Sequence, residues 1–426
     1  MNADLISNSK DTDVACNIRC SKKQLQKKCR NFDFSRHCQR RIALKIAYLG
    51  WDYEGFVVQE NTAKTIEAEL FAALEKTKLI MSRKTSCYHR CGRTDKGVSA
   101  FSQVVSLNLR SAHKSGLGIF RFNNVTSDKE QQSNDECCSQ QPSSAESSSY
   151  LDDRNELDYS YLLNRVLPSC IRVLAWAPVP GDFSARFDCK QRTYKYFFPR
   201  SNLDIEKMRE ASKLLLGSHD FRNFCKMDVA NGVKEYVRNI YSVTIASTAN
   251  CECERSCFDM CCITISANAF AWHQIRSIVS VLFLIGEGNE EPSVISDLLN
   301  VERNPSKPQY TLAADYPLNL FDCTFDEHAV QWRTTSENIN NTAKHLQAKW
   351  TDLSTKARMV QEMLEFMQKK HSVHFDQQHA TLIPGNKPKN YVKLMKRPTC
   401  DSLEAKIKKE DRRKMRRLDE SCGSDS

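Results

Sequence analysis

The sequence predicts an α+β protein made of two halves that share an order of elements. In residues 42–177, segments of alternating apolar residues and helical apolar stripes follow the order β-α-β-β-α-β, which is typical of a ferredoxin-like unit. Residues 192–285 show a second series of strands and helices in a similar order. We therefore expect two ferredoxin-like halves that form one extended, mostly antiparallel sheet, with helices on one side and a central active-site cleft.

The first half is assigned from its apolar periodicity. Residues 42–48 form a strand, because every second side chain is apolar. Residues 65–79 form a helix, since Ile66, Leu70 and Leu74 fall on one stripe. The remaining elements of this half are two strands, a helix and a last strand, at residues 85–90, 103–109, 157–167 and 171–177.

A polar segment interrupts the first half. Residues 111–155 are rich in Ser, Gln, Asn and Asp, and we expect a mobile insertion there. In the second half the predicted elements are a strand, a helix, two strands and a long helix, at residues 192–198, 203–216, 237–246, 262–267 and 270–285.

These elements divide the chain into four parts. We expect a basic disordered tail at 1–38, an N-terminal half at 39–180, a C-terminal half at 181–325 and a helical, charged extension at 326–426. The extension ends in a basic block, residues 406–417, which is a nuclear-import signal, an RNA-binding arm or a solvated tail.

Composition limits the class of protein. The 426 residues are enough for two packed domains, and 27 % charged with 40 % hydrophobic residues predicts a mostly folded chain. The net charge of +10 suits a polyanionic partner. The longest apolar run, residues 278–285, is far too short to span a membrane, and no secretory signal is visible. We therefore expect no membrane association.

The chain has nineteen cysteines, and we expect them to be reduced thiols used as small apolar residues. The densest group lies between Cys251 and Cys262, but it crowds its thiols too closely for the usual paired spacing of a zinc site. A Cys-rich hairpin loop is the better interpretation, and the sequence predicts no metal site. Cys87 and Cys91 are interpreted as strand packing beside a loop.

Three segments have residue types that can perform chemistry, and the first is residues 88–100. It joins two predicted strands and places Asp95 among Arg93, Lys96 and His89. Neighbouring cations keep a carboxylate ionised, so Asp95 is a candidate nucleophile or base. The alternative is a tight turn with a salt bridge, because Asp-Lys-Gly is ordinary turn chemistry.

The second segment, residues 183–200, interleaves aromatic and basic side chains. Arg192, Tyr194 and Tyr196 would share one face of a strand, an arrangement that suits stacking on bases and contact with phosphates. The alternative is a half-buried strand whose aromatic side chains pack and whose cations meet water.

The third segment, residues 267–279, begins the predicted long helix. Phe270, His273 and Arg276 are spaced by three and so lie near one another. An arginine close to an apolar stripe is costly to bury without a carboxylate, and Asp95 is a candidate partner. Alternatively, Arg276 reaches the surface and His273 is a core residue.

Together the three segments resemble the pseudouridine synthases of the TruA type. Residues 92–100 look like that family's nucleophile motif, and residues 192–196 and 267–276 look like its second and third motifs. The resemblance covers about residues 41–325. It implies a fold of two ferredoxin-like (RRM-like) halves with the active-site cleft between them.

The chain is most similar to the eukaryotic branch that modifies uridines 38 and 39 of tRNA. Residues 225–233 matter most, because the sister branch that acts elsewhere on tRNA is not expected to have them. The other similar segments are residues 59–62, 65–71, 88–91, 281–288 and 307–310. The chain departs from the family at residues 51–57, which lack a common Gly-Trp-Gln, and at Ser99, which replaces a common His.

The resemblance implies a reaction in which uridine is detached at N1, turned over and rejoined through C5, with no cofactor. Asp95 would be the essential carboxylate, which attacks the ribose C1′ or removes the C2′ proton. Arg276 would orient Asp95, and Tyr194 would stack on the base and could take the C5 proton. Arg93 would contact the RNA backbone. The other predicted RNA-binding residues are Lys96, Arg186, Arg192, Phe270 and His273.

The resemblance also implies tRNA as partner and a homodimer, and with the basic block we expect the nucleus and cytoplasm. Two other functions remain open. One is a non-catalytic RNA-binding protein on the same scaffold, and the other is a glycosylase that uses the same aspartate to release uracil.

Overall fold

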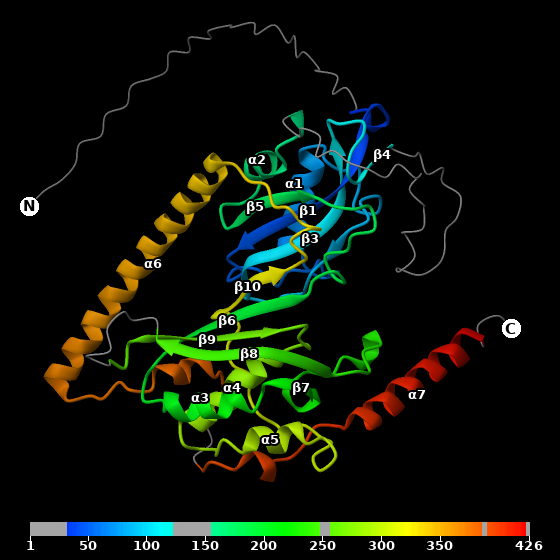
Figure 1. The fold of residues 1–426 in the computed structure, drawn as a ribbon. Helices are drawn as coiled ribbons and strands as arrows, with labels where there is room; N and C mark the ends of the chain where they lie inside the picture. The colour runs from blue at the N-terminus through cyan, green and yellow to red at the C-terminus, as the bar shows by residue number, and fades with distance from the viewer. Residues whose placement is uncertain (1–31, 122–154, 248–255, 386–389, 423–426) are drawn as a thin grey trace, which may run out of the picture. The chain divides into compact units, whose positions relative to one another are not determined.

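The computed structural model describes residues 32–121, 155–247, 256–385 and 390–422 (Figure 1). Residues 1–31 of the predicted tail, residues 122–154 of the predicted insertion, and Cys251 and Cys253 of the predicted hairpin loop lie outside the described residues.

The N-terminal half has the strand order of a ferredoxin-like unit. Its sheet runs β5-β1-β3-β2, and every pair is antiparallel. The strands are β1 (Cys38–Tyr48), β2 (His89–Arg90), β3 (Ser99–Ser111) and β5 (Ile171–Pro178). The short β4 (Ile119–Arg121) pairs with the start of β1. The strand predicted at 85–90 is confirmed only as the two residues of β2.

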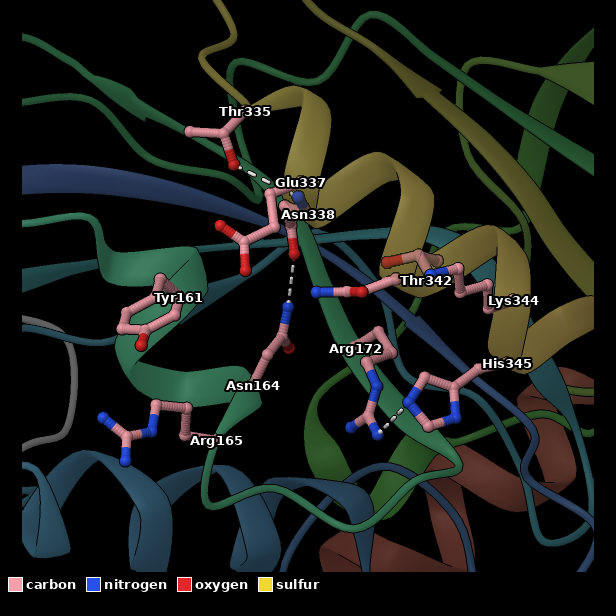
Figure 2. Close-up of a pocket in the computed structure, with 11 residues that line it drawn as sticks. Tyr161, Asn164, Arg165, Arg172, Thr335, Glu337, Asn338, Thr342, Lys344 and His345 are labelled. Carbon is pink, nitrogen blue, oxygen red and sulfur yellow. Dashed lines mark hydrogen bonds between the residues drawn. The ribbon is translucent and has the colours of Figure 1, made fainter.

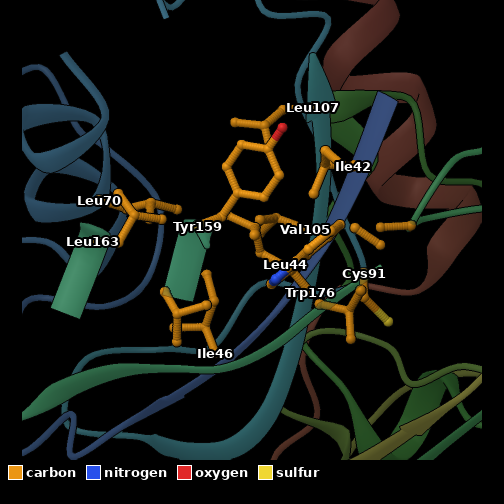
Figure 3. Packing of buried hydrophobic residues seen from close by; sticks show 14 of the residues in the cluster. Ile42, Leu44, Ile46, Leu70, Cys91, Val105, Leu107, Tyr159, Leu163 and Trp176 are labelled. Carbon is orange, nitrogen blue, oxygen red and sulfur yellow. The ribbon is translucent and has the colours of Figure 1, made fainter. Parts of the chain in front are cut away.

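Two capped helices pack on this half. In α1 (Ile66–Lys76) the Thr65 hydroxyl accepts a hydrogen bond from the Ala68 amide, and in α2 (Tyr159–Asn164) Asp158 accepts one from the Tyr161 amide. Such caps satisfy amides that the first helical turn leaves unpaired. The apolar side chains of both helices and of β1, β3 and β5 form one core, part of which Figure 3 shows.

The C-terminal half repeats the arrangement. Its sheet runs β10-β6-β9-β8, with β7 (Gly217–Asp220) added beside β8. The main strands are β6 (Gln191–Pro199), β8 (Val237–Ser247), β9 (Met260–Ala267) and β10 (Leu318–Thr324). The helices are α3 (Ile205–Lys213), α4 (Gln274–Gly286) and α5 (Val294–Leu299), which contribute to a second core. The sequence did not predict β7, α5 or β10.

The two halves meet at β10. This strand pairs antiparallel with β6 and parallel with β3, where Asn319 lies opposite Ser99 and Leu320 opposite Ala100. The result is one ten-stranded, mostly antiparallel sheet, and the predicted α+β fold is confirmed.

The extension contains two long helices, α6 (Ser336–His371) and α7 (Leu403–Cys422). Asn338 anchors the start of α6, because its side-chain amide donates to the Val173 and Leu174 carbonyls of β5. Within the described ranges, no helix combines the length and the apolar character that crossing a membrane requires.

Shortening the Leu320 side chain of β10 should weaken the whole fold, because this side chain is fully buried at the join of the two halves. We expect Leu320→Ala to lower the free energy of unfolding by about 3 kcal/mol, measured by urea denaturation. Leu216→Ala is the control, because Leu216 is 41 % exposed and its loss should change stability by less than about 0.5 kcal/mol. Equal effects of the two substitutions would contradict this role of β10.

Candidate active site

Asp95 lies in the loop between β2 and β3, which the N-terminal half holds in place. The Thr94 hydroxyl is 2.7 Å from the Tyr48 hydroxyl, and the Thr94 carbonyl accepts the Phe56 amide. Gly97 has φ +74°, and a Cβ there would lie 2.8 Å from an oxygen of Asp315. A side chain at position 97 would be strained and crowded, so glycine fixes the turn that presents Asp95.

Three side chains at the start of α4 converge on the Asp95 carboxylate. The Trp272 indole Nε1 donates to Oδ1 at 3.1 Å, His273 Nε2 is 3.4 Å from Oδ2, and Arg276 Nη1 is 4.0 Å from Oδ2. His273 precedes the helix with φ +63°, a left-handed conformation that is uncommon for a non-glycine residue. The predicted neighbours Asp95 and Arg276 are thus brought together from different halves. Sequence reasoning missed Trp272.

The positive charge in this cluster comes from the Arg276 side chain. Burial raises the pKa of Asp95 above its usual value, while Arg276, the Trp272 hydrogen bond and Lys226 oppose that rise. Burial, together with Arg276 and Lys226, lowers the pKa of His273 to about 4. The imidazole is therefore neutral at pH 7, and Arg276 is the cation that contacts the carboxylate.

Arg276 is itself fixed from a second direction. Its Nε donates to the Ala313 carbonyl at 2.7 Å, and its Nη2 is 3.8 Å from Asp315. The guanidinium therefore lies between two carboxylates, and Asp315 is among the groups that raise the pKa of Asp95. The sequence offered no sign of Asp315, because nothing near it in the chain resembles a site.

Lys226 reaches the same cluster through Trp272. Its ammonium lies 4.0 Å from the indole ring centroid, a cation–π contact, and its backbone amide donates to the Trp272 carbonyl. Lys226 belongs to residues 225–233, the segment that the sequence analysis singled out. The contact explains how that segment can influence the carboxylate without touching it.

Tyr194 and Phe270 form the aromatic part of the site. Their rings pack edge to face with centroids 5.2 Å apart, and a Cβ on Gly92 would lie 3.9 Å from the Tyr194 hydroxyl. Burial raises the pKa of Tyr194 well above its usual value, with a further contribution from Asp95 among others. The phenol is therefore protonated at neutral pH.

The predicted basic residues are placed differently from one another. Arg93 and Arg186 are exposed, whereas Lys96 pairs with Glu54 at 2.8 Å. Partial burial of the Arg93 guanidinium lowers its pKa, and the nearby Arg90 and Arg186 lower it further, so the three cations lie near one another. Arg192 is occupied within the protein. Its guanidinium donates to four backbone carbonyls, those of Cys91, Arg186, Cys189 and Asn268.

A separate polar pocket of about 310 Å³ lies between α2, β5 and α6 (Figure 2). Arg172 contacts His345 across it at 3.2 Å, and Asn164 donates to Asn338 at 2.7 Å. None of the predicted site residues lines it.

Replacing Asp95 should change stability in a pH-dependent way. Because folding raises the pKa of Asp95, ionising it costs stability between its unfolded pKa, about 3.9, and its folded pKa. The free energy of unfolding of Asp95→Asn, relative to that of wild type, should therefore increase as pH rises through that window to 7. Urea denaturation at a series of pH values measures this.

Asp326→Asn is the control, because Lys190 lowers the pKa of that exposed carboxyl and its loss should bring no such gain. A gain in Asp95→Asn that does not grow with pH would contradict the effect of burial on Asp95.

Comparison with known proteins places the chain in a family. A family profile described as tRNA pseudouridine synthase matches residues 211–326. The chain is 45 % identical to the tRNA pseudouridine(38/39) synthase of Bos taurus, over 89 % of this chain and 78 % of that protein. It is 44 % identical to the protein of that name from Homo sapiens, over 92 % and 81 %. It is 33 % identical to tRNA pseudouridine synthase A of Methanosarcina mazei, over 61 % and 76 %. The chain belongs to the tRNA pseudouridine synthase family.

Proposed function

We propose that the protein isomerises uridine to pseudouridine in the anticodon stem-loop of tRNA, at positions 38 and 39. The observation that carries this is the partly buried Asp95, which Trp272 and Arg276 contact and which interacts electrostatically with the Tyr194 phenol. Support for the positions comes from the relatives, whose names specify 38/39.

Asp95 begins the reaction in this proposal. It either attacks the ribose C1′ or removes the C2′ proton, and the N1–C1′ bond breaks. The base turns over and C5 bonds to C1′. In the first route the bond between Asp95 and C1′ breaks at this step, and in the second the proton returns to C2′. The C5 proton leaves and N1 gains a proton, so atoms balance with no oxidant or reductant. Arg276 orients the carboxylate and keeps it ionised. These roles fit the geometry, since the Arg276 guanidinium is fixed by Ala313 and Asp315.

Tyr194 lies where it can stack on a base that has left the RNA helix. As a protonated phenol it presents an aromatic face and a hydroxyl group. The hydroxyl oxygen can accept the C5 proton only if the phenol passes its own proton to another group. A uridine inside a stem must be unstacked, which costs a few kcal/mol. In this proposal, phosphate contacts of Arg93, Arg186 and Lys96 offset that cost. Phe270 and His273 contribute by contacting the unstacked nucleotide.

Arg192 acts indirectly in this proposal. Because its guanidinium donates hydrogen bonds to four carbonyls, Arg192 connects the Asp95 loop to the segments before β6 and after β9.

We also propose the division into halves at 39–180 and 181–325, with the join at β10. Nuclear and cytoplasmic localisation is proposed from the basic residues of α7, and imaging of a tagged protein without residues 403–426 tests it.

The homodimer is proposed through α6. Apolar residues recur along this helix with spacings of four and three, which is the heptad pattern of a two-stranded coiled coil. The two alternating positions are Ile339, Leu346, Leu353, Val360 and Met367, and Ala343, Trp350, Ala357 and Leu364. Trp350 is 69 % exposed, and Ile339, Leu346, Leu353, Val360 and Met367 are exposed as well, whereas Leu364 is half-buried. A second copy of the same helix is the partner that such a self-complementary pattern fits.

A charge in the α6 seam should separate the subunits. We expect Trp350→Glu with Leu353→Glu to convert a dimer into a monomer in sedimentation equilibrium, because both side chains would lie at the coiled-coil interface. Thr355→Glu is the matched control, since this residue lies on the opposite side of the helix by the same heptad. A monomeric wild-type protein would contradict the proposal, and so would a double variant that stays dimeric.

The reaction itself is tested by mapping pseudouridine at single-nucleotide resolution in tRNA incubated with purified protein. Wild type should modify positions 38 and 39. Asp95→Asn should bind tRNA normally and lose activity by about 10³-fold or more, because the reacting carboxylate is gone. Asp326→Asn, an exposed carboxylate exchanged in the same way, should keep full activity.

Each other outcome has a distinct meaning. Modification at other positions would overturn the assigned positions. Tight binding without product would favour a non-catalytic RNA-binding protein, and free uracil would favour a glycosylase. Full activity in Asp95→Asn would contradict the proposed mechanism.

A further inference from the structure

Three cysteines that are far apart in the sequence meet beneath the Asp95 loop. Cys91 lies in that loop, Cys189 precedes β6 and Cys323 is part of β10. Their three Sγ atoms all lie within 4.8 Å of one another, and the Cys91 and Cys323 atoms are 3.3 Å apart. All three thiols are free and at most 6 % exposed. The catalytic proposal uses none of them.

These sulfur–sulfur distances are close to those between thiolates that share one metal ion. Zinc–sulfur bonds are about 2.3 Å long, so thiolates on one ion lie about 3.8 to 4.0 Å apart. The three sulfur atoms therefore need to move by roughly 1 Å or less. The Cys189 thiol also lies 3.3 Å from the Gln191 carbonyl oxygen, to which it donates a hydrogen bond. Each cysteine is fixed by a strand or by Arg192, so the cluster is organised before any ion binds.

Two cationic side chains lie near the cysteine cluster. The Arg192 guanidinium donates to the carbonyls of both Cys91 and Cys189, and the ammonium of Lys45 also interacts with Cys323. A bound divalent ion would add the positive charge that three thiolates need.

We propose that Cys91, Cys189 and Cys323 form a binding site for one thiophilic cation, held by three thiolates. Binding releases the protons that the thiols carry and involves no change of oxidation state. A divalent ion with three thiolates has a net charge of −1, which Arg192 offsets. The ion would cross-link the Asp95 loop to β10, at the join of the two halves. This proposal does not depend on the proposed reaction.

Sequence spacing could not show this site, because its ligands come from three separate segments and form no paired motif. Among the residues that the structure describes, these three cysteines are the metal-ligating side chains whose donor atoms lie close enough together to share one ion. Cys257, Cys261 and Cys262, from the crowded segment that the sequence analysis considered for zinc, do not join it.

Cadmium is the probe, because Cd²⁺–thiolate bonds absorb in the ultraviolet. Titrating the full-length, reduced, metal-free protein with Cd²⁺ should show saturation of this absorption at one equivalent per chain, with protons released. Cys189→Ser and Cys323→Ser should each weaken binding at least tenfold. Cys225→Ser is the matched control, since Cys225 is equally buried but outside the cluster, and it should bind as wild type does.

A second measurement covers the case in which a serine variant folds poorly. Alkylation of the wild-type protein with and without Cd²⁺, read by mass spectrometry, should show protection of Cys91, Cys189 and Cys323 together. Elemental analysis of the purified protein, and displacement of Cd²⁺ by Zn²⁺ or Cu⁺, identify the natural ion. Absence of thiolate absorption would overturn the proposal, and so would binding that persists in both serine variants or protection of other cysteines alone.

Discussion

The contact between Asp95 and Arg276 is the interaction on which the arrangement of the site depends. It joins a loop of the N-terminal half to the first turn of α4 in the C-terminal half. A carboxylate that is three-quarters buried needs a nearby cation to remain ionised, and His273 cannot supply one because its pKa is lowered to about 4. Arg276 fills that need, and Ala313 and Asp315 hold it in place. The site exists only when both halves are in register.

That register is set by β10. The strand continues the C-terminal sheet through β6 and pairs with β3 immediately after the Asp95 loop, at Ser99 and Ala100. Any shift of β10 would move Asp95 relative to α4. Arg192 adds a second connection, since it binds carbonyls on both sides of the join. Cys91 and Cys323 lie at the same join, where a bound cation would add a third.

Periodicity alone predicted most of the fold. The alternation at residues 42–48 and the stripe of Ile66, Leu70 and Leu74 match β1 and α1 closely, because each element buries one apolar face. β10 was missed, since its buried side chains, Leu318, Leu320 and Cys323, break the alternation of a strand after Leu320, where the register shifts. The two-residue β2 shows another limit of prediction from apolar alternation. The adjacent turn sets the ends of this strand, and the alternation of its own side chains does not.

The candidate site was predictable where chemistry and spacing coincide. Asp95, Tyr194 and Arg276 were found because each sits in a distinctive segment, and the structure brings all three together. Trp272 lies in one of those segments but was not singled out, because an indole next to a histidine has no predictable direction. Asp315 was found only through its tertiary contact with Arg276, whereas Lys226 lies in the segment 225–233 that the sequence singled out without giving this lysine a role.

The central claim is that the partly buried Asp95 must be ionised and that its neighbours set its pKa. The most direct test is the pH dependence of single-turnover pseudouridine formation in wild type and in Trp272→Phe. Phenylalanine keeps an aromatic ring beside Lys226 but removes the N–H that donates to Asp95. The account predicts that the acidic limb of the profile moves to higher pH in the variant, with a similar rate on the plateau. An acidic limb that stays in place would contradict it.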